Sequence, residues 1–500
     1  MIRLRQAGRT LEVSAAVTGI GAAGPYAMLQ VLAPGRSGVA AAAMSYSLLL
    51  IVLAAVVALF WRRCSVSARL QRRVDLLEIP LYLSLTGVLL IGVFGLPVFW
   101  DDTLLVPTLD PADMPAGLLL SMLALVAIWA GYATGMIGMT RQPRRGSTDD
   151  PRYAPKLTAA TALYLVVLAI RVNLLVQGEG EHYRATRQLG DYQQLLIYMI
   201  EMRWFFLAMT QYEAFRGKWP MGAAVAITLA EAAMSLAAGW TSGLLKVSII
   251  TMATLGYAQR QIAARIAIVS LLGVAILMPI AREMRKVYSV DTDSAVTQFR
   301  TAVSGSRQEY VDSLTSLLFR RQGAVAQTPS LIMALTPSVV PYRPLSELMA
   351  IPVSFVPRFV WPDKPMFSQA SGDVSSAYFG ADGSGSSATT LAGSAYVYGG
   401  IVPVLILAPL LGLLAAALYR TLVLPGFDGR PVLIPIYVAV VIGTFQIGEG
   451  DLISVWQSII QRTLVFGAVA VLVTVLPRAL RFTAKMKASK RVAPMRPLVH

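Results

Sequence analysis

Long apolar runs separated by short polar connections dominate the chain. A helix needs about 20 apolar residues to cross a bilayer core of about 30 Å. Windows of that length fall at roughly 12–33, 38–60, 79–99, 115–138, 157–176, 195–214, 220–238, 243–258, 264–281, 395–419, 431–448 and 452–476. The pattern predicts an all-α polytopic integral membrane protein with about 12 transmembrane helices.

One connection, residues 282–394, is far longer than the others. Connections of more than about 12–15 residues are usually functional or disordered. Residues 306–325 have apolar positions at helical spacing, which predicts an amphipathic helix. Prolines from Pro341 onward favour an extended path. Residues 381–390 are rich in Gly and Ser. The chain therefore divides into an N-terminal membrane domain (1–281, about nine helices), a large loop (282–394), C-terminal membrane helices (395–476, about three) and a basic tail (477–500).

Composition supports the membrane class and gives no sign of a cofactor. Hydrophobic residues make up 56% of the chain and charged residues 14%, with a mean hydropathy of +0.61, which excludes an ordinary soluble protein. The single cysteine, Cys64, cannot form an internal disulfide and has no metal-ligand spacing. Walker, HExxH and CxxC motifs are absent from the sequence, so neither ATP hydrolysis nor zinc catalysis is predicted, and we expect no metal and no cofactor.

Much of the positive charge behind the net charge of +16 follows from topology. Most of the 43 lysines and arginines fall in 1–11, 61–78, 141–156, 214–219, 258–265, 420–430 and 476–500, whereas the alternate short connections hold only Arg36, Arg184 and Arg187. The positive-inside rule then places both termini in the cytoplasm and the large loop outside. Contact with anionic lipid accounts for the basic segments, and nucleic acid is not an expected partner.

Six ionisable residues lie inside predicted spans, where each costs about 2.5–3.5 kcal/mol on insertion scales and is a functional candidate. They are Arg171, Glu201, Arg203, Glu231, Lys246 and Arg462. The first five lie in the outer half of their spans, which predicts a polar cavity that opens outward beneath the large loop. Glu201 and Arg203 point in different directions from one helix, so each needs a partner on another helix, and Glu231 is one candidate. The alternative is that these residues form buried ion pairs that fix helix packing.

The functional interpretation gains from an excess of positive charge. Four cations face two carboxylates in this set, and Arg184, Arg187, Arg282 and Arg285 lie at the same membrane face. Arginine suits phosphate oxygens, which it can grip with two parallel hydrogen bonds. A polyprenyl pyrophosphate sugar is the natural anion at this place. Sugar rings could stack on Tyr183, Tyr192, Trp204, Trp240 or Trp361, although aromatic residues at such depths also form interfacial belts.

Three sequence motifs carry a resemblance to a known family. They are PRFVWPDKP at 357–365, TTLAGSAYVYG at 389–399 and GWTSGLLK at 239–246. The first two resemble the outer loop and the helix after it in Wzy-type O-antigen polymerases, the oligosaccharide repeat-unit polymerases. The arrangement of membrane spans with one dominant late loop also resembles that family over the whole chain. Members often have Glu between the Thr and Tyr positions of the second motif, where Gly393 and Ser394 stand here.

The resemblance implies a GT-C-like fold and a metal-independent, inverting glycosyltransferase that uses an undecaprenyl-pyrophosphate donor. A growing glycan, of O-antigen or exopolysaccharide, would be moved onto the terminal sugar of a newly flipped repeat unit at the periplasmic face. The expected partners are the undecaprenyl-pyrophosphate-linked oligosaccharide, membrane lipids and a chain-length regulator protein.

This chemistry needs cations for the departing pyrophosphate and a base for the attacking hydroxyl. We expect Arg171, Arg184, Arg187, Arg203, Lys246, Arg358 and Lys364 to bind the pyrophosphate. The candidate catalytic bases are His182, Glu201 and Glu231, with Glu449 and Asp451 behind them, and Tyr183, Trp240 and Trp361 are the candidate sugar-binding residues. His182 ranks first because its charge changes near neutral pH.

Three other functions remain open at the level of sequence. A flippase or transporter for the same lipid-linked sugars predicts two similar halves, and no internal repeat is found. An O-antigen ligase shares the donor and the fold. A polyprenyl-phosphate-sugar transferase often has an acidic pair in an early outer loop, a role that Asp101 and Asp102 could fill.

Overall fold

The computed structural model is helical in every described element. It describes residues 37–64, 78–87, 93, 95–99, 109–137, 150, 153–176, 193–238, 241–259, 273, 277, 280–281, 322–348, 356, 361, 378, 389–443 and 452–475. The predicted span at 12–33 and nearly all of the span at 264–281 lie outside these residues, as does most of the amphipathic helix expected at 306–325.

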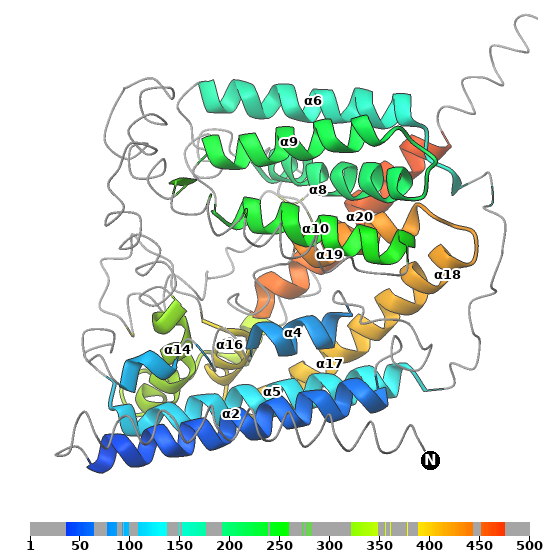
Figure 1. Cartoon of the computed structure of the whole chain (residues 1–500). Coiled ribbons are helices and arrows are strands. Elements are labelled where there is room, and N and C mark those ends of the chain that lie inside the picture. Colours follow the sequence, from blue (N-terminus) through cyan, green and yellow to red (C-terminus); the bar gives the residue numbers. More distant parts are fainter. Residues whose placement is uncertain are drawn as a thin grey trace, which may run out of the picture.

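One layer of the molecule consists of four helices that pack along one another (Figure 1). They are α2 (Ser37–Cys64), α4 (Ile79–Gly87), α5 (Met114–Gly135) and α17 (Ile401–Leu418), the last continuing through a π-helical turn (Tyr419–Val423) into α18 (Leu424–Phe427). Short 3-10 helices at Leu96–Phe99 and Pro111–Asp113 precede α5. A buried hydrogen bond from Trp129 Nε1 to Ser84 Oγ, 2.9 Å, ties α5 to α4.

Glycines allow α5 and α17 to touch through their backbones. A Cβ added at Gly131 would collide with the carbonyl oxygen of Pro409, and one at Gly412 would collide with the carbonyl oxygen of Ile128. Gly131 and Gly135 are four residues apart on α5, the small-residue spacing that lets membrane helices approach closely. Dispersion contacts hold this layer together, because lipid gives no hydrophobic drive for two apolar helices to associate.

The second layer contains α6 (Leu157–Val176), α8 (Gln193–Phe215), α9 (Met221–Ala237) and α10 (Thr241–Gln259), with α6 at the top of Figure 1. Between the layers lie α19 (Leu433–Gly443) and α20 (Leu452–Thr474). All side chains from Ile436 to Ile442 are buried, as are those from Trp204 to Met209 of α8. Helices that are apolar on every side form the centre of a large core, so α8 and α19 are the central elements.

The described C-terminal part of the large loop packs at one end of the bundle, which we name the α14 end (Figure 1). It includes α14 (Gln322–Leu335) and, just after the loop's second motif begins, α16 (Leu391–Tyr396). Ser330 Oγ of α14 donates to the carbonyl oxygen of Met114 at the start of α5, 3.2 Å. Gly117 has no room for a Cβ because Ser330 lies against it. α14 is thus seated beside the first turns of α5.

Contacts at the opposite end fix the direction of the helices. Arg420 donates to the carbonyl oxygen of Gly135 at the end of α5, 2.9 Å, and the amide of Asp150, before α6, donates to the carbonyl oxygen of Gly429, 2.8 Å. α6 therefore starts at this end and, at 1.5 Å per residue, reaches the α14 end after about 30 Å.

The prediction of an all-α membrane protein is confirmed at the level of its class. Among the described residues, four helices are long and apolar enough to cross a membrane by length and composition, at Ala41–Phe60, Pro111–Gly135, Leu157–Leu174 and Ile401–Phe427. Shorter apolar helices include Met221–Ala237, Ser242–Ala258 and Ser458–Thr474. The total of about 12 spans, the GT-C-like architecture and the boundaries of the four predicted regions stay predictions.

Two local features differ from the sequence pattern for identifiable reasons. α14 was not expected, because Pro329 in its middle marks a helix break in sequence, yet the helix continues through it. The span expected at 395–419 begins at Ile401, because Gly399 and Gly400 both have positive φ and separate α16 from α17.

Alanine at Gly131 tests the backbone contact between α5 and α17. We expect Gly131→Ala to destabilise the protein by about 1–3 kcal/mol through overpacking, seen as a lower apparent melting temperature in detergent. Gly467→Ala on α20 is the matched control, since a Cβ there meets open space. Equal melting temperatures for both variants would contradict the proposed close contact.

Candidate functional site

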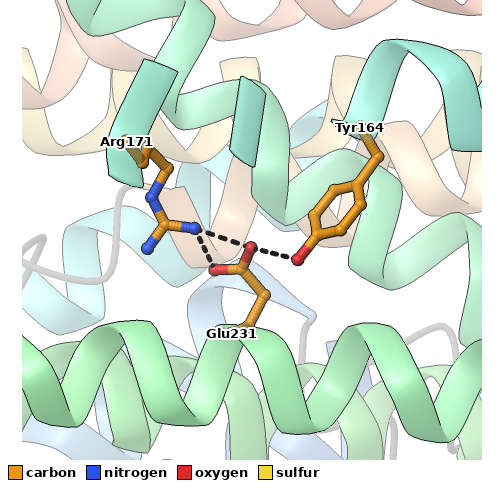
Figure 2. Close-up of polar contacts among 3 residues, drawn as sticks. All are labelled: Tyr164, Arg171 and Glu231. Carbon is orange, nitrogen blue, oxygen red and sulfur yellow. Dashed lines mark hydrogen bonds and ion pairs between the residues drawn. The ribbon is translucent and has the colours of Figure 1, made fainter. Parts of the chain in front are cut away.

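A buried ion pair joins α6 to α9 in the half of these helices nearer the α14 end. Arg171 Nη1 lies 2.7 Å from Glu231 Oε1 and 2.8 Å from Oε2, and the Tyr164 hydroxyl donates to Oε1 at 2.9 Å (Figure 2). Tyr164 and Arg171 are seven residues apart, so they project from the same face of α6. Both charged side chains are fully buried, and the three hydrogen bonds offset part of the cost of removing them from water.

A second ion pair joins α8 to α20. Arg462 Nη2 lies 3.1 Å from Glu201 Oε2. The sequence required a partner for Glu201 on another helix, and this requirement is met by a residue more than 250 positions away in the chain.

Two further cations lie against the ring of Trp204. The guanidinium carbon of Arg203 is 4.4 Å from the ring centroid, and Nζ of Lys246, from α10, is 5.5 Å from it. Cations at such distances are attracted by the electron-rich face of an indole ring. The ring is completely buried, and its Nε1–H has no hydrogen-bond partner among the described residues. Trp204 was a candidate platform for sugar; its burial among cations makes it a platform for positive charge instead.

The two ion pairs and the Trp204 cations form one group, which we name the charged cluster: Arg171, Glu201, Arg203, Glu231, Lys246 and Arg462. Lys246 is within electrostatic range of Glu201, Arg203 and Arg462. Tyr164 is within range of Arg203 as well as of its own partners. The six residues singled out in the sequence are therefore brought together, four of them basic and two acidic.

The charged cluster is closed. Arg171, Glu201, Arg203, Glu231 and Lys246 are at most 6% exposed, and the Arg462 side chain is 16% exposed. Within the described part of the chain, these side chains form a packed group and not the wall of an open cavity. The outward-opening cavity expected from the sequence is thus not seen here, because the ion pairs and Trp204 fill the space between the helices.

A neutral polar network lies further along α8, toward the opposite end. Gln211 Nε2 donates to Thr228 Oγ1 of α9 at 2.9 Å and to Thr251 Oγ1 of α10 at 2.8 Å, and its Oε1 accepts from Thr254 at 3.0 Å. Each threonine also donates to, or lies within reach of, a carbonyl of its own helix. This network fixes α9 and α10 against α8 and so holds Lys246 at the level of Trp204.

The loop residues at the α14 end form a separate polar region. Thr390 has φ of +56° and ψ of 158°, a conformation that L-residues rarely adopt, and its hydroxyl accepts from the amide of Gly393 at 3.2 Å to begin α16. Tyr378 hydrogen-bonds Thr336. Burial raises the pKa of the Tyr378 phenol, an effect reduced by that hydrogen bond and by the charge of Arg343, so the group stays neutral at physiological pH.

Several residues predicted from sequence lie outside the described residues: His182, Tyr183, Arg184, Arg187, Trp240, Arg358 and Lys364. Their roles stay predictions. Trp361 is described and is 38% exposed, which is compatible with either sugar binding or an interfacial position. Among the described residues, no group of three or more His, Cys, Asp or Glu is placed to hold a metal ion.

Sequence reasoning missed one residue of the site. Tyr164 lies in an apolar span where an aromatic residue carries no signal of its own. The available sign was its seven-residue spacing from Arg171, which puts both residues on one face of the helix. An arginine in lipid needs a buried anion, and that anion needs further hydrogen-bond donors such as a tyrosine hydroxyl.

Comparison of the chain with protein-family models, curated proteins and solved structures found no match. The class that the fold and the site define is an all-helical membrane protein with a closed, cation-rich cluster between its helices.

Charge removal tests the Arg171–Glu231 pair. We expect Arg171→Met or Glu231→Leu alone to cost about 3–5 kcal/mol, because each leaves one buried charge without its partner. The double variant should regain most of this loss, and Tyr164→Phe should cost about 1.5–3 kcal/mol as the loss of one hydrogen bond to a charged group. The melting temperatures of these four purified variants measure the effects. A double variant that is no more stable than the less stable single variant would refute the pairing.

Proposed function

We propose that the protein polymerises undecaprenyl-pyrophosphate-linked oligosaccharide repeat units at the outer face of a bacterial inner membrane. The supporting observation is the charged cluster, in which four basic and two acidic side chains lie between apolar helices and all but Arg462 are buried. Such a group is costly to bury and attracts an anion that is itself at membrane depth. The pyrophosphate of a lipid-linked sugar meets that description, and the resemblance of residues 357–365 and 389–399 to Wzy-type polymerases points the same way.

In this proposal the acceptor hydroxyl attacks the anomeric carbon of the donor glycan. The bond from that carbon to the pyrophosphate oxygen breaks, the pyrophosphate departs with the electron pair, and a base takes the hydroxyl proton. Arg203 and Lys246 are our candidate cations for the leaving group, because both lie against the buried ring of Trp204. Developing negative charge is stabilised most by cations already held in position.

The geometry also bears on the choice of base. Both oxygens of Glu231 accept from Arg171, and one also accepts from Tyr164. An acceptor sugar would have to displace these donors, which favours a positioning role for Glu231. Glu201 and His182 are then the stronger candidates for proton transfer.

A flippase and an O-antigen ligase would use the same anion and are the alternatives. They differ from a polymerase in the species that accumulates when the protein is missing. A strain lacking a flippase retains lipid-linked units on the cytoplasmic side, whereas one lacking a ligase retains polymer on undecaprenyl pyrophosphate.

Glycan ladders test the proposal directly. A deletion strain is expected to carry a single repeat unit on its outer lipid, and the wild-type gene should restore long chains. Arg203→Gln and Lys246→Gln should lower the ratio of long chains to single units by about tenfold or more, the effect of losing about 1.5–3 kcal/mol of charge-assisted hydrogen bonding. Arg216→Gln is the matched control, since this arginine directly follows the last residue of α8 at the opposite end and pairs with Glu213. All variants are compared at equal membrane abundance.

Ligand stabilisation of the purified protein tests the anion separately. A short-chain polyprenyl pyrophosphate should raise the melting temperature in detergent, and the matching polyprenyl alcohol should not, because only the former carries the anion. Lys246→Gln should abolish the difference between the two ligands. Equal stabilisation by alcohol and pyrophosphate would show that the isoprenoid alone is recognised.

A further inference from the structure

A segment of the large loop, residues 337–346, presents apolar side chains to its surroundings at the α14 end. Val339 is 69% exposed, Leu345 59% and Tyr342 40%. Three prolines, Pro337, Pro341 and Pro344, restrict the backbone of the segment, which is not α-helical. The other exposed residues are Ser338, Ser346 and the three prolines, so the exposed residues of 337–346 carry no formal charge.

The ionisable groups of this region pair with one another. Arg343 Nη1 lies 3.2 Å from Glu347 Oε2, and the Tyr398 hydroxyl donates to the same oxygen at 3.3 Å. Both charged side chains are partly buried. A loop in water normally has the reverse arrangement, with its charges outward and its apolar groups covered.

The segment is fixed at the level where a membrane helix begins. The amide of Arg343 donates to the carbonyl oxygen of Val397, 2.8 Å, in the turn between α16 and α17. The rings of Tyr342 and Tyr396 are in contact, with centroids 6.4 Å apart. α17 starts four residues after Val397, and its exposed side chains are apolar from the first turn: Ile401, Val402, Leu405 and Ile406.

We propose that residues 337–346 are a membrane anchor that inserts Val339, Tyr342 and Leu345 into the boundary between lipid headgroups and acyl chains. Tyr342 lies next to Gly400, the residue before α17. The exposed apolar surface of α17 faces lipid in a membrane-spanning helix. Burial in lipid removes apolar area from water at about 25 cal/mol per Å². Tyrosine is a residue typical of this interface. The anchor would hold α16 at the membrane surface, and this inference does not depend on the enzymatic proposal.

Spin labels in lipid nanodiscs test the anchor. On a Cys64→Ser background, single labels are placed at Val339→Cys and Leu345→Cys. Leu405→Cys on α17 serves as the lipid control, and Lys218→Cys, exposed in the connection between α8 and α9, serves as the water control. Collision rates are measured with oxygen, which partitions into lipid, and with a neutral nickel chelate, which remains in water.

We expect labels at 339 and 345 to resemble the label at 405: accessible to oxygen and at least several-fold less accessible to nickel than the label at 218. Their depth should fall within about 5–10 Å of the headgroup boundary. Nickel accessibility equal to that at 218 would overturn the proposal in favour of an aqueous loop. Poor accessibility to both reagents would also overturn it, since another part of the protein or a second copy would then cover the segment.

Discussion

Charge buried inside an apolar bundle is the constraint on which the second layer depends. α8 is surrounded by α6, α9, α10, α19 and α20, yet it carries Glu201 and Arg203 at buried positions. Water is not at hand to solvate these groups, so neighbouring helices must supply the compensating charges. Arg462 does so from α20, and the equivalent requirement on Arg171 is met by Glu231 of α9. One ion pair thereby fixes the relative heights of α8 and α20, and the other fixes those of α6 and α9.

The two layers are held together by different physics. α5 and α17 approach through Gly131 and Gly412, where dispersion contacts between backbones leave no room for adjustment. α8, α9 and α10 are joined instead by the Gln211 network and by the charged cluster. Hydrogen bonds and ion pairs can exchange partners when a new anion arrives, whereas interlocked backbones cannot. Any adjustment to a bound anion therefore belongs to the second layer, with the first acting as a fixed support.

The sequence was sufficient for some of these features and insufficient for others. The span at 157–176 coincides with α6, since an apolar window of this length has few alternatives to a membrane helix. The six charged residues were also recognisable, because charge inside such a window is rare. Their pairing was not: which cation meets Glu201 depends on helix rotation and neighbours, and Arg462 lies far away in sequence. α14 was hidden for a different reason, since Pro329 interrupts the local signal while tertiary contacts with α5 preserve the helix.

The closed state of the cluster raises the question of how an anion reaches it, and α20 offers a physical link. α16, at the C-terminal end of the large loop, contacts α20, and α20 carries Arg462, the most exposed member of the cluster. α16 itself begins at Thr390, whose unusual backbone conformation persists only because the surrounding packing enforces it. A change in the loop that releases this conformation would act on α20 before any other helix of the cluster. Glu201, the ion-pair partner of Arg462, also acts electrostatically on Lys246, as does Arg462 itself. Movement of α20 would therefore alter the charge balance at Trp204, where the leaving group is proposed to bind.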